Sequence, residues 1–238
     1  MQASELTPKL MNFGLTRQEA MVYQQLVISG ECTGYEVAKE LGISRSNAYS
    51  SLTSLVDKGA VYLQSGNTNK YLAVDVSEFC GNRIRSLETD KKDLEDNLKV
   101  KEESEGYVTI FGYKNIQNKV ATMLSNVEQR VYISLRSEKL FLFNNYLEKL
   151  VVDKKKVVII TDKEPDLKDC SVYLSDSLME NQIRLIVDSK YVLTGDFEDN
   201  IDATCLYSGQ KNFVSLFKDA MRNEIELIKL RSKESDEN

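Results

Sequence analysis

Short polar side chains are concentrated between residues 44 and 53, on a stretch whose apolar residues recur at helical spacing. Hydroxyl and amide groups can hydrogen-bond to DNA base edges, and a guanidinium can bind either a guanine or a phosphate. The sequence does not decide between these two roles for Arg45. We expect a DNA-contacting face formed by Ser44, Arg45, Ser46, Asn47, Tyr49, Ser50 and Thr53. The alternative is a structural helical hairpin with a solvated polar side.

Two predicted helices would position this face. Thr33 and Glu36 are spaced as a capping box that opens the first helix, and Gly42 suits the turn that ends it. Ser44 fits the N-cap of the second helix. The pattern therefore predicts a helix, a tight turn and a second helix that carries the polar face.

A β-hairpin is predicted directly after these helices. Residues 61–63 and 71–73 have strand patterns, and residues 65–69 have the composition of a turn. The order of helix, turn, helix and hairpin is typical of a winged helix-turn-helix DNA-binding domain, which we place at residues 1–75. Further candidates for DNA contact are Thr33, Lys58, Asn69 and Lys70.

Catalytic and metal-binding residue types are sparse in this chain. It contains no histidine, so a Ser-His-Asp triad, a Cys-His dyad and an imidazole metal site are excluded. The four cysteines are widely separated and form no CxxC pair. No glycine-rich phosphate loop is present either. We therefore predict no catalytic residue, no metal site and no cofactor, and we do not expect an enzyme.

The N-terminal third resembles the DNA-binding domain of TrmB-type transcriptional regulators. The resemblance rests on Leu15-Thr16-Arg17-Gln18-Glu19-Ala20 with Tyr23, on Leu41-Gly42-Ile43-Ser44-Arg45-Ser46 with Tyr49, Leu52 and Leu55, and on Lys58-Gly59. It implies a winged helix that binds double-stranded DNA. The wing tip of that family is often basic and contains proline, whereas this tip reads Gly66-Asn67-Thr68-Asn69 before Lys70.

A long polar helix is expected at residues 76–105. Its apolar residues form a narrow stripe like a coiled-coil seam, with mixed charges on the other faces. We expect this helix to pair two copies of the chain through Phe79, Ile84, Leu87, Leu94 and Leu98. The alternative is a solvated linker helix that packs on its own chain.

The rest of the chain alternates strand and helix patterns, which predicts a small α/β domain with a central sheet at residues 106–231. A single helix is expected at residues 138–152, a loop at 162–169 and a closing helix at 213–230. A disordered tail is expected at 232–238. Ligands often lie at strand ends in such sheets, so Asp162, Asp188 and Lys190 are weak candidates for binding a small-molecule effector, with ordinary turn residues as the alternative.

This second part more weakly resembles the phospholipase D-like domain of TrmB-type regulators. The resemblance rests on element order and on Ile183-Arg184-Leu185-Ile186-Val187-Asp188, which leads into a short strand. Active phospholipase D enzymes use a His-x-Lys motif, and this chain has no histidine, so the resemblance does not imply catalysis here. The sugar-binding extension of longer family members has no counterpart expected after Leu230, so sugar recognition is not inferred.

The overall composition fits a globular protein, with 42% hydrophobic and 29% charged residues. The net charge of −6 predicts weak non-specific affinity for DNA, although three basic residues stand against one acidic residue between Leu41 and Val74. We expect no secretory signal, no membrane span and a cytoplasmic location. The leading hypothesis is a dimeric, sequence-specific transcriptional regulator. The main alternative is an architectural or protein-binding winged-helix protein.

Overall fold

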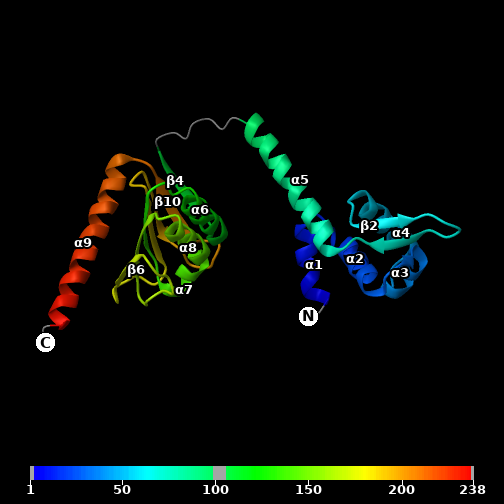
Figure 1. The fold of residues 1–238 in the computed structure, drawn as a ribbon, viewed down its shortest axis with the longest axis horizontal. Coiled ribbons are helices and arrows are strands. Elements are labelled where there is room, and N and C mark those ends of the chain that lie inside the picture. Colours follow the sequence, from blue (N-terminus) through cyan, green and yellow to red (C-terminus); the bar gives the residue numbers. More distant parts are fainter. Residues whose placement is uncertain (1–2, 99–105, 237–238) are drawn as a thin grey trace. The chain divides into compact units, whose positions relative to one another are not determined.

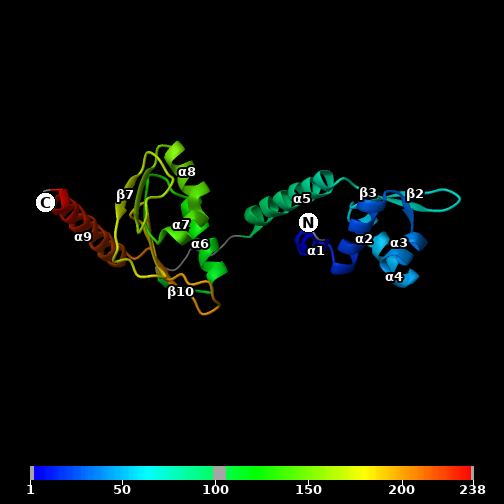
Figure 2. The ribbon, with the colours of Figure 1, turned by 90° about the horizontal axis from the view of Figure 1, so that it is seen from below.

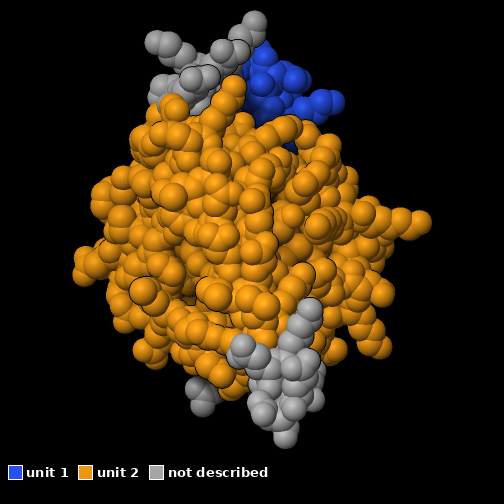
Figure 3. Space-filling view, turned by 90° about the vertical axis from the view of Figure 1, so that its left-hand side faces the viewer, with its two compact units in different colours: residues 1–100 blue, residues 101–238 orange. Residues whose placement is uncertain are grey.

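The computed structural model describes residues 3–98 and 106–236. The chain divides into two compact units, residues 1–100 (unit 1) and residues 101–238 (unit 2), which are coloured separately in Figure 3. Unit 1 is a helical domain with a small sheet and one long helix, and unit 2 is a larger sheet flanked by helices (Figure 1). The predicted fold class, a winged helix-turn-helix, a long helix and an α/β domain, is confirmed.

Four helices build the body of unit 1: α1 (Ala3–Asn12), α2 (Arg17–Ser29), α3 (Gly34–Leu41) and α4 (Arg45–Asp57). Helix α2 begins at a capping box in which Thr16 and Glu19 bond each other's backbone N–H groups. The inward side chains of these helices form one core that includes Tyr23, Leu26 and Leu52, each no more than 1% exposed. Burial of these apolar groups holds α2 and α4 together in one core.

A three-stranded antiparallel sheet completes the winged helix. Its strands are β1 (Cys32–Thr33), β2 (Val61–Gln64) and β3 (Lys70–Ala73), in the order β1-β3-β2. Val61 and Tyr71 are buried against the helices, while the residues between them are exposed. The Tyr23 hydroxyl donates to the Val74 carbonyl at 2.7 Å, which ties the end of the hairpin to α2.

Helix α5 (Val76–Asn97) follows the wing, and the Asp75 carboxylate accepts the N–H groups of its first turn. Phe79 is 3% exposed and packs beside Tyr23 with ring centroids 5.7 Å apart. The prediction that Phe79 contacts a second copy is therefore wrong, because this ring fills the core of its own unit. The remaining predicted pairing residues are all exposed: Ile84, Leu87, Leu94 and Leu98. The last part of the predicted helix, residues 99–105, lies outside the described residues.

Unit 2 is built on a seven-stranded sheet. Its strands are β4 (Tyr107–Phe111), β5 (Arg130–Ser134), β6 (Lys156–Thr161), β7 (Ser171–Leu174), β8 (Gln182–Val187), β9 (Tyr191–Asp196) and β10 (Thr204–Ser208). Their spatial order is β4-β10-β9-β8-β5-β6-β7. The β5-β6 and β6-β7 pairs are parallel, and the other pairs are antiparallel.

Helices cover both faces of this sheet. One face packs against α6 (Tyr113–Ser125), α7 (Ser137–Leu140), the 3₁₀ turn η1 (Phe141–Phe143) and α8 (Asn144–Val152). The other face packs against α9 (Lys211–Asp236), which lies opposite α6 to α8 in Figure 2. Ile159 faces the first core and Ile160 the second, so strand β6 is buried on both sides.

Three boundaries in unit 2 differ from the prediction. The helix expected at 138–152 is interrupted by η1, which turns Phe143 into the core. The segment after the expected loop contains β7, a short edge strand. Helix α9 continues to Asp236, so the prediction of a disordered tail is wrong for residues 232–236. Residues 237–238 lie outside the described part of the chain.

Candidate nucleic-acid interface

A tight turn between α3 and α4 fixes the geometry of the helix pair. Gly42 adopts a left-handed backbone with φ of 63°, a conformation that costs glycine little. The next N–H group, of Ile43, donates to the Ala38 carbonyl at 3.0 Å, which closes the end of α3. Ser44 then caps α4, because its hydroxyl accepts the Asn47 N–H at 3.1 Å. The two predicted roles of Gly42 and Ser44 are confirmed.

Helix α4 has one buried side and one polar side. Ala48, Ser51, Leu52 and Leu55 are buried in the core. The predicted contact residues all lie on the opposite, exposed surface: Ser44, Arg45, Ser46, Asn47, Tyr49, Ser50 and Thr53. Within the described residues, the side chains of Ser46, Ser50 and Thr53 make no hydrogen bond. The exposed side of α4 thus presents hydrogen-bond donors and acceptors that have no partner among the described residues.

Arg45 has an aromatic partner that the sequence analysis missed. Its guanidinium lies over the ring of Tyr35, 4.5 Å from the centroid. A cation above an aromatic face is attracted by the ring quadrupole, and the contact restricts the Arg45 rotamers. Tyr35 is itself 49% exposed. The sequence signal for Tyr35 was an aromatic residue off the apolar side of α3, beside the buried Val37 and Ala38.

Tyr49 is half-exposed, and its ring lies directly over Gly34 at the start of α3. A Cβ atom at position 34 would lie 2.5 Å from the Tyr49 ring, which is closer than real contacts allow. Glycine at this position therefore lets the Tyr49 ring cover the N-terminus of α3. The residue both packs between the two helices and contributes to the exposed surface.

Thr33 caps α3 and is committed to that role. Its hydroxyl accepts the Glu36 N–H at 3.3 Å and donates to the Glu36 carboxylate at 2.9 Å. The Thr33 N–H also donates to this carboxylate, at 2.8 Å. These hydrogen bonds lower the pKa of Glu36. Thr33 thus stabilises the start of α3, and its hydroxyl is less available for DNA than the sequence suggested.

Lys58 does not lie free at the interface. Its ammonium donates to the Glu19 carboxylate at 2.6 Å and to the Gly14 carbonyl at 2.9 Å. Glu19 is 6% exposed; burial alone would raise its pKa, but hydrogen bonds from Lys58, Ser54 and the Thr16 N–H lower it to about 2. The prediction of a phosphate contact by Lys58 is corrected, because its charge is bound to a buried carboxylate.

The wing offers few charges. Asn69 is exposed in the turn of the hairpin, as expected. Lys70 is also exposed, but its ammonium lies 3.3 Å from the Glu31 carboxylate. Both members of this ion pair are open to solvent, so the pair is weak and Lys70 can exchange partners. The wing thus adds at most one cation to the surface that α4 presents.

The three effector candidates of unit 2 do not form one site. Asp162 follows β6 and accepts the Ser137 N–H at 2.6 Å. Asp188 follows β8, which runs antiparallel to β5, so the two carboxylates lie at opposite ends of β5. Burial would raise the pKa of each carboxyl, but accepted backbone hydrogen bonds lower it. Both carboxylates therefore have structural roles.

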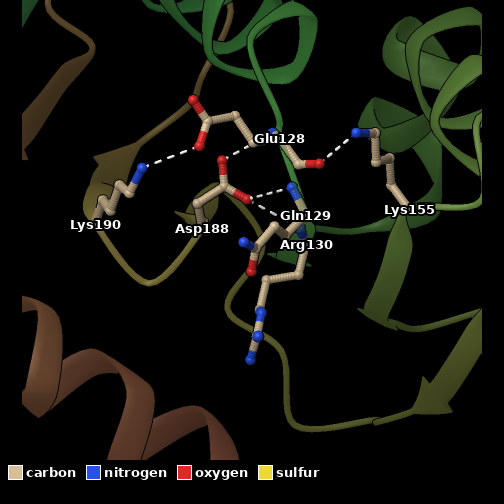
Figure 4. A network of polar contacts seen from close by, with 6 residues as sticks. All are labelled: Glu128, Gln129, Arg130, Lys155, Asp188 and Lys190. Atoms are coloured by element: carbon tan, nitrogen blue, oxygen red, sulfur yellow. Dashed lines mark hydrogen bonds and ion pairs between the residues drawn. The ribbon is translucent and has the colours of Figure 1, made fainter.

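Figure 4 shows the network around the second of these carboxylates. The Asp188 oxygens accept the N–H groups of Glu128, Gln129 and Arg130 at 2.9, 2.8 and 2.9 Å. The Lys190 ammonium lies 3.0 Å from the Glu128 carboxylate. Among the predicted effector residues, Lys190 alone has a side chain that is largely exposed.

Comparison with known proteins identifies the first unit. Residues 10–77 match the family model described as "Sugar-specific transcriptional regulator TrmB". The N-terminal domain is of the TrmB type. The match covers α2 to β3 completely and so includes the capped turn and the exposed side of α4.

Two curated proteins are similar over more than this TrmB-type domain. One is "Uncharacterized protein YrhO" of Bacillus subtilis (strain 168), 29% identical over 192 residues, which are 79% of this chain and 69% of that protein. The other is "HTH-type sugar sensing transcriptional regulator TrmBL1" of Pyrococcus furiosus, 27% identical over 166 residues. That alignment covers 67% of this chain and 48% of the regulator, so this chain spans about half of its length.

Solved structures of similar arrangement include TrmBL2, described as an archaeal chromatin protein with a novel mode of DNA binding. It is 22% identical, with 95% of this chain and 99% of that chain covered and a TM-score of 0.45. A phospholipase D family member, Nuc from Salmonella typhimurium, is 13% identical and covers 50% of this chain and 93% of its own, with a TM-score of 0.40.

The described residues contain neither a membrane-spanning helix nor a cluster of metal-binding side chains. No helix among residues 3–98 and 106–236 is long and apolar enough to cross a membrane. In the same residues, no group of three or more cysteine, aspartate or glutamate side chains is arranged to hold a metal ion.

Proposed function

We propose that this protein is a sequence-specific DNA-binding transcriptional regulator that acts as a dimer in the cytoplasm, with unit 2 as its sensing or assembly domain. The observation that carries the proposal is the exposed polar side of α4, whose opposite side is locked in the core of a TrmB-type domain. A helix fixed in this way can enter the major groove with its orientation already set.

The side chains on α4 suggest how DNA would be read. Arg45 is placed to bind a guanine edge or a phosphate, and its contact with Tyr35 limits the conformations it must lose on binding. Ser46 and Asn47 can reach base edges from the first turn, where the positive end of the helix dipole also favours phosphate. Asn69 and Lys70 would contact the backbone from the wing.

Helix α5 supports the dimer. Ile84, Leu87, Leu94 and Leu98 are between 46% and 63% exposed and recur at spacings of three, seven and four residues. Large apolar residues at this spacing form the seam of a two-stranded coiled coil. Pairing through this stripe would cover it and would give the protein a twofold axis, which matches the symmetry of inverted-repeat operators.

Enzymatic activity is not part of the proposal. The chain contains no histidine, which the catalytic motif of phospholipase D enzymes requires. The sugar sensing named for one relative is not transferred either, since this chain covers about half of that protein.

A selection from random duplex DNA at near-physiological salt tests the proposal. We expect an enriched inverted repeat whose half-sites are one helical turn apart, about 10 base pairs. The Arg45→Ala variant should enrich this repeat poorly, because the polar side of α4 has lost its only arginine. No enriched sequence with the wild-type protein would count against a regulator and favour a winged helix that binds a protein partner.

A further inference from the structure

A basic cavity lies beside the start of α9 in unit 2. It has a volume of about 360 Å³, within the range of small-molecule sites. One wall is the turn between β8 and β9, with Ser189, Lys190 and Tyr191. The other wall is the first two turns of α9, with Lys211, Ser215 and Lys218. The cavity lined by these six residues is called the α9 cavity below.

Three lysines line this cavity, in a chain whose net charge is −6. Lys190 is paired with Glu128 at 3.0 Å. Neither Lys211 nor Lys218 forms an ion pair within the described residues. Like charges at short range repel each other, so the α9 cavity is electrostatically favourable for an anion.

The turn that forms the first wall is held in a fixed conformation. Asp188 and Ser189 both have positive φ, 51° and 56°, which is uncommon for residues other than glycine. Three backbone N–H groups bind the Asp188 carboxylate and hold this turn against the start of β5 (Figure 4). The backbone of Ser189 and Lys190 is therefore fixed in advance, so a ligand that binds this turn need not order the backbone.

The second wall adds complementary groups. Helix α9 is 26 residues long and begins at Lys211, so the positive end of its dipole lies at the cavity. Ser215 contributes a hydroxyl that can donate to an anion oxygen. Gly209, just before the helix, allows the two walls to approach, because a Cβ there would lie 3.0 Å from the Tyr191 ring.

We propose that the α9 cavity binds the phosphate group of a small phosphorylated metabolite. A phosphate monoester carries a charge of about −1.5 to −2 at pH 7 and three acceptor oxygens, which matches three lysines and two hydroxyls better than a single carboxylate does. The biological role of this ligand, as the effector of unit 2, rests on the proposed regulatory function. Binding itself does not, and it is measured without DNA.

Titration calorimetry on the full chain tests the proposal, with glycerol 3-phosphate as the probe and glycerol as the matched neutral compound. Chloride keeps the ionic strength constant. The wild-type protein should bind the phosphate ester and not glycerol. Binding should be tighter at pH 7.5 than at pH 5.5, because the second pKa of a phosphate is about 6.

The Lys211→Ala/Lys218→Ala variant should weaken this binding by about tenfold or more, since each charge-assisted hydrogen bond contributes more than a neutral one. Lys168→Ala is the matched control: it removes an exposed lysine after β6, outside the cavity, and should bind like the wild type. Thermal unfolding of each variant without ligand verifies that unit 2 is folded.

Two results would overturn the proposal. One is the absence of binding to the wild-type protein. The other is equal binding by the wild type and by a folded double variant. If the double variant lost only affinity for DNA, the cavity would contact nucleic-acid backbone, and the small-ligand proposal would also be overturned. A failed selection of an operator leaves these measurements unaffected, so the two proposals fail separately.

Discussion

The polar side of α4 and the polar turn after β8 were both predicted as binding sites. They differ in how many of their polar side chains are already hydrogen-bonded within the protein. On α4, Ser46, Ser50 and Thr53 are exposed and make no hydrogen bond within the described residues. After β8, the Asp188 carboxylate already accepts three backbone N–H groups. A polar group on a rigid element is available to a ligand only when the protein has not satisfied it internally. Residue type alone does not make this distinction.

Helix α5 shows the same contrast with apolar groups, and it gives the largest predicted effect. Phe79→Ala should destabilise unit 1 by about 3–5 kcal/mol, because the ring fills its core. Leu87→Glu should change the stability of the folded chain by no more than about 0.5 kcal/mol and should convert the proposed dimer to a monomer. Denaturant unfolding and light scattering at micromolar concentration measure the two effects. A Leu87→Glu protein that remains dimeric would remove α5 from the pairing surface.

The Lys58–Glu19 pair gives the next largest effect. Lys58→Ala should cost about 2–3 kcal/mol of folding stability, because it leaves a buried carboxylate without its cation. DNA affinity of the folded variant should not change, since Lys58 faces Glu19 and Gly14. The control is Lys92→Ala, which removes an exposed lysine from α5. Unchanged stability together with weaker DNA binding would restore Lys58 to the interface.

The same pair predicts a dependence of stability on pH. The pKa of Glu19 falls from 4.5 to about 2 on folding, so its ionised form stabilises the folded state above pH 4.5. This contribution is lost as the pH falls toward the folded pKa. The unfolding free energy of the wild type should therefore decrease more steeply between pH 4.5 and 2 than that of Glu19→Gln. Parallel curves would show that Glu19 is not specially stabilised as a carboxylate.

Local interactions could be predicted from the sequence, and long-range ones could not. The caps at Thr33 and Ser44 join residues three apart, so both could be recognised from their spacing. Lys58 meets Glu19 across 39 residues, and Asp188 meets its donors across about 60. The spacing of residues along the sequence does not indicate partners that are so far apart. The sequence therefore predicted α4 and its capped start, but it assigned DNA or ligand contacts to side chains that already have partners elsewhere in the fold.

The secondary-structure errors in unit 2 have similar causes. The stretch 138–152 has continuous helical spacing, but packing of Phe143 into the core imposes a 3₁₀ turn there. Strand β7 is a four-residue edge strand, and its half-buried residues give little alternation to detect. Helix α9 continues to Asp236, past the apolar stripe from which its end was predicted.

The most direct test of the central claim is the affinity of Arg45→Ala for the DNA site selected by the wild type, measured beside Lys92→Ala at the same salt concentration. Both variants lose one positive charge, but only Arg45 lies on the polar side of α4. We predict that Arg45→Ala weakens binding by about 1–3 kcal/mol while its unfolding curve stays unchanged. Lys92→Ala should bind like the wild type. Equal affinities for the two variants would contradict the assignment of α4 as the DNA-reading surface.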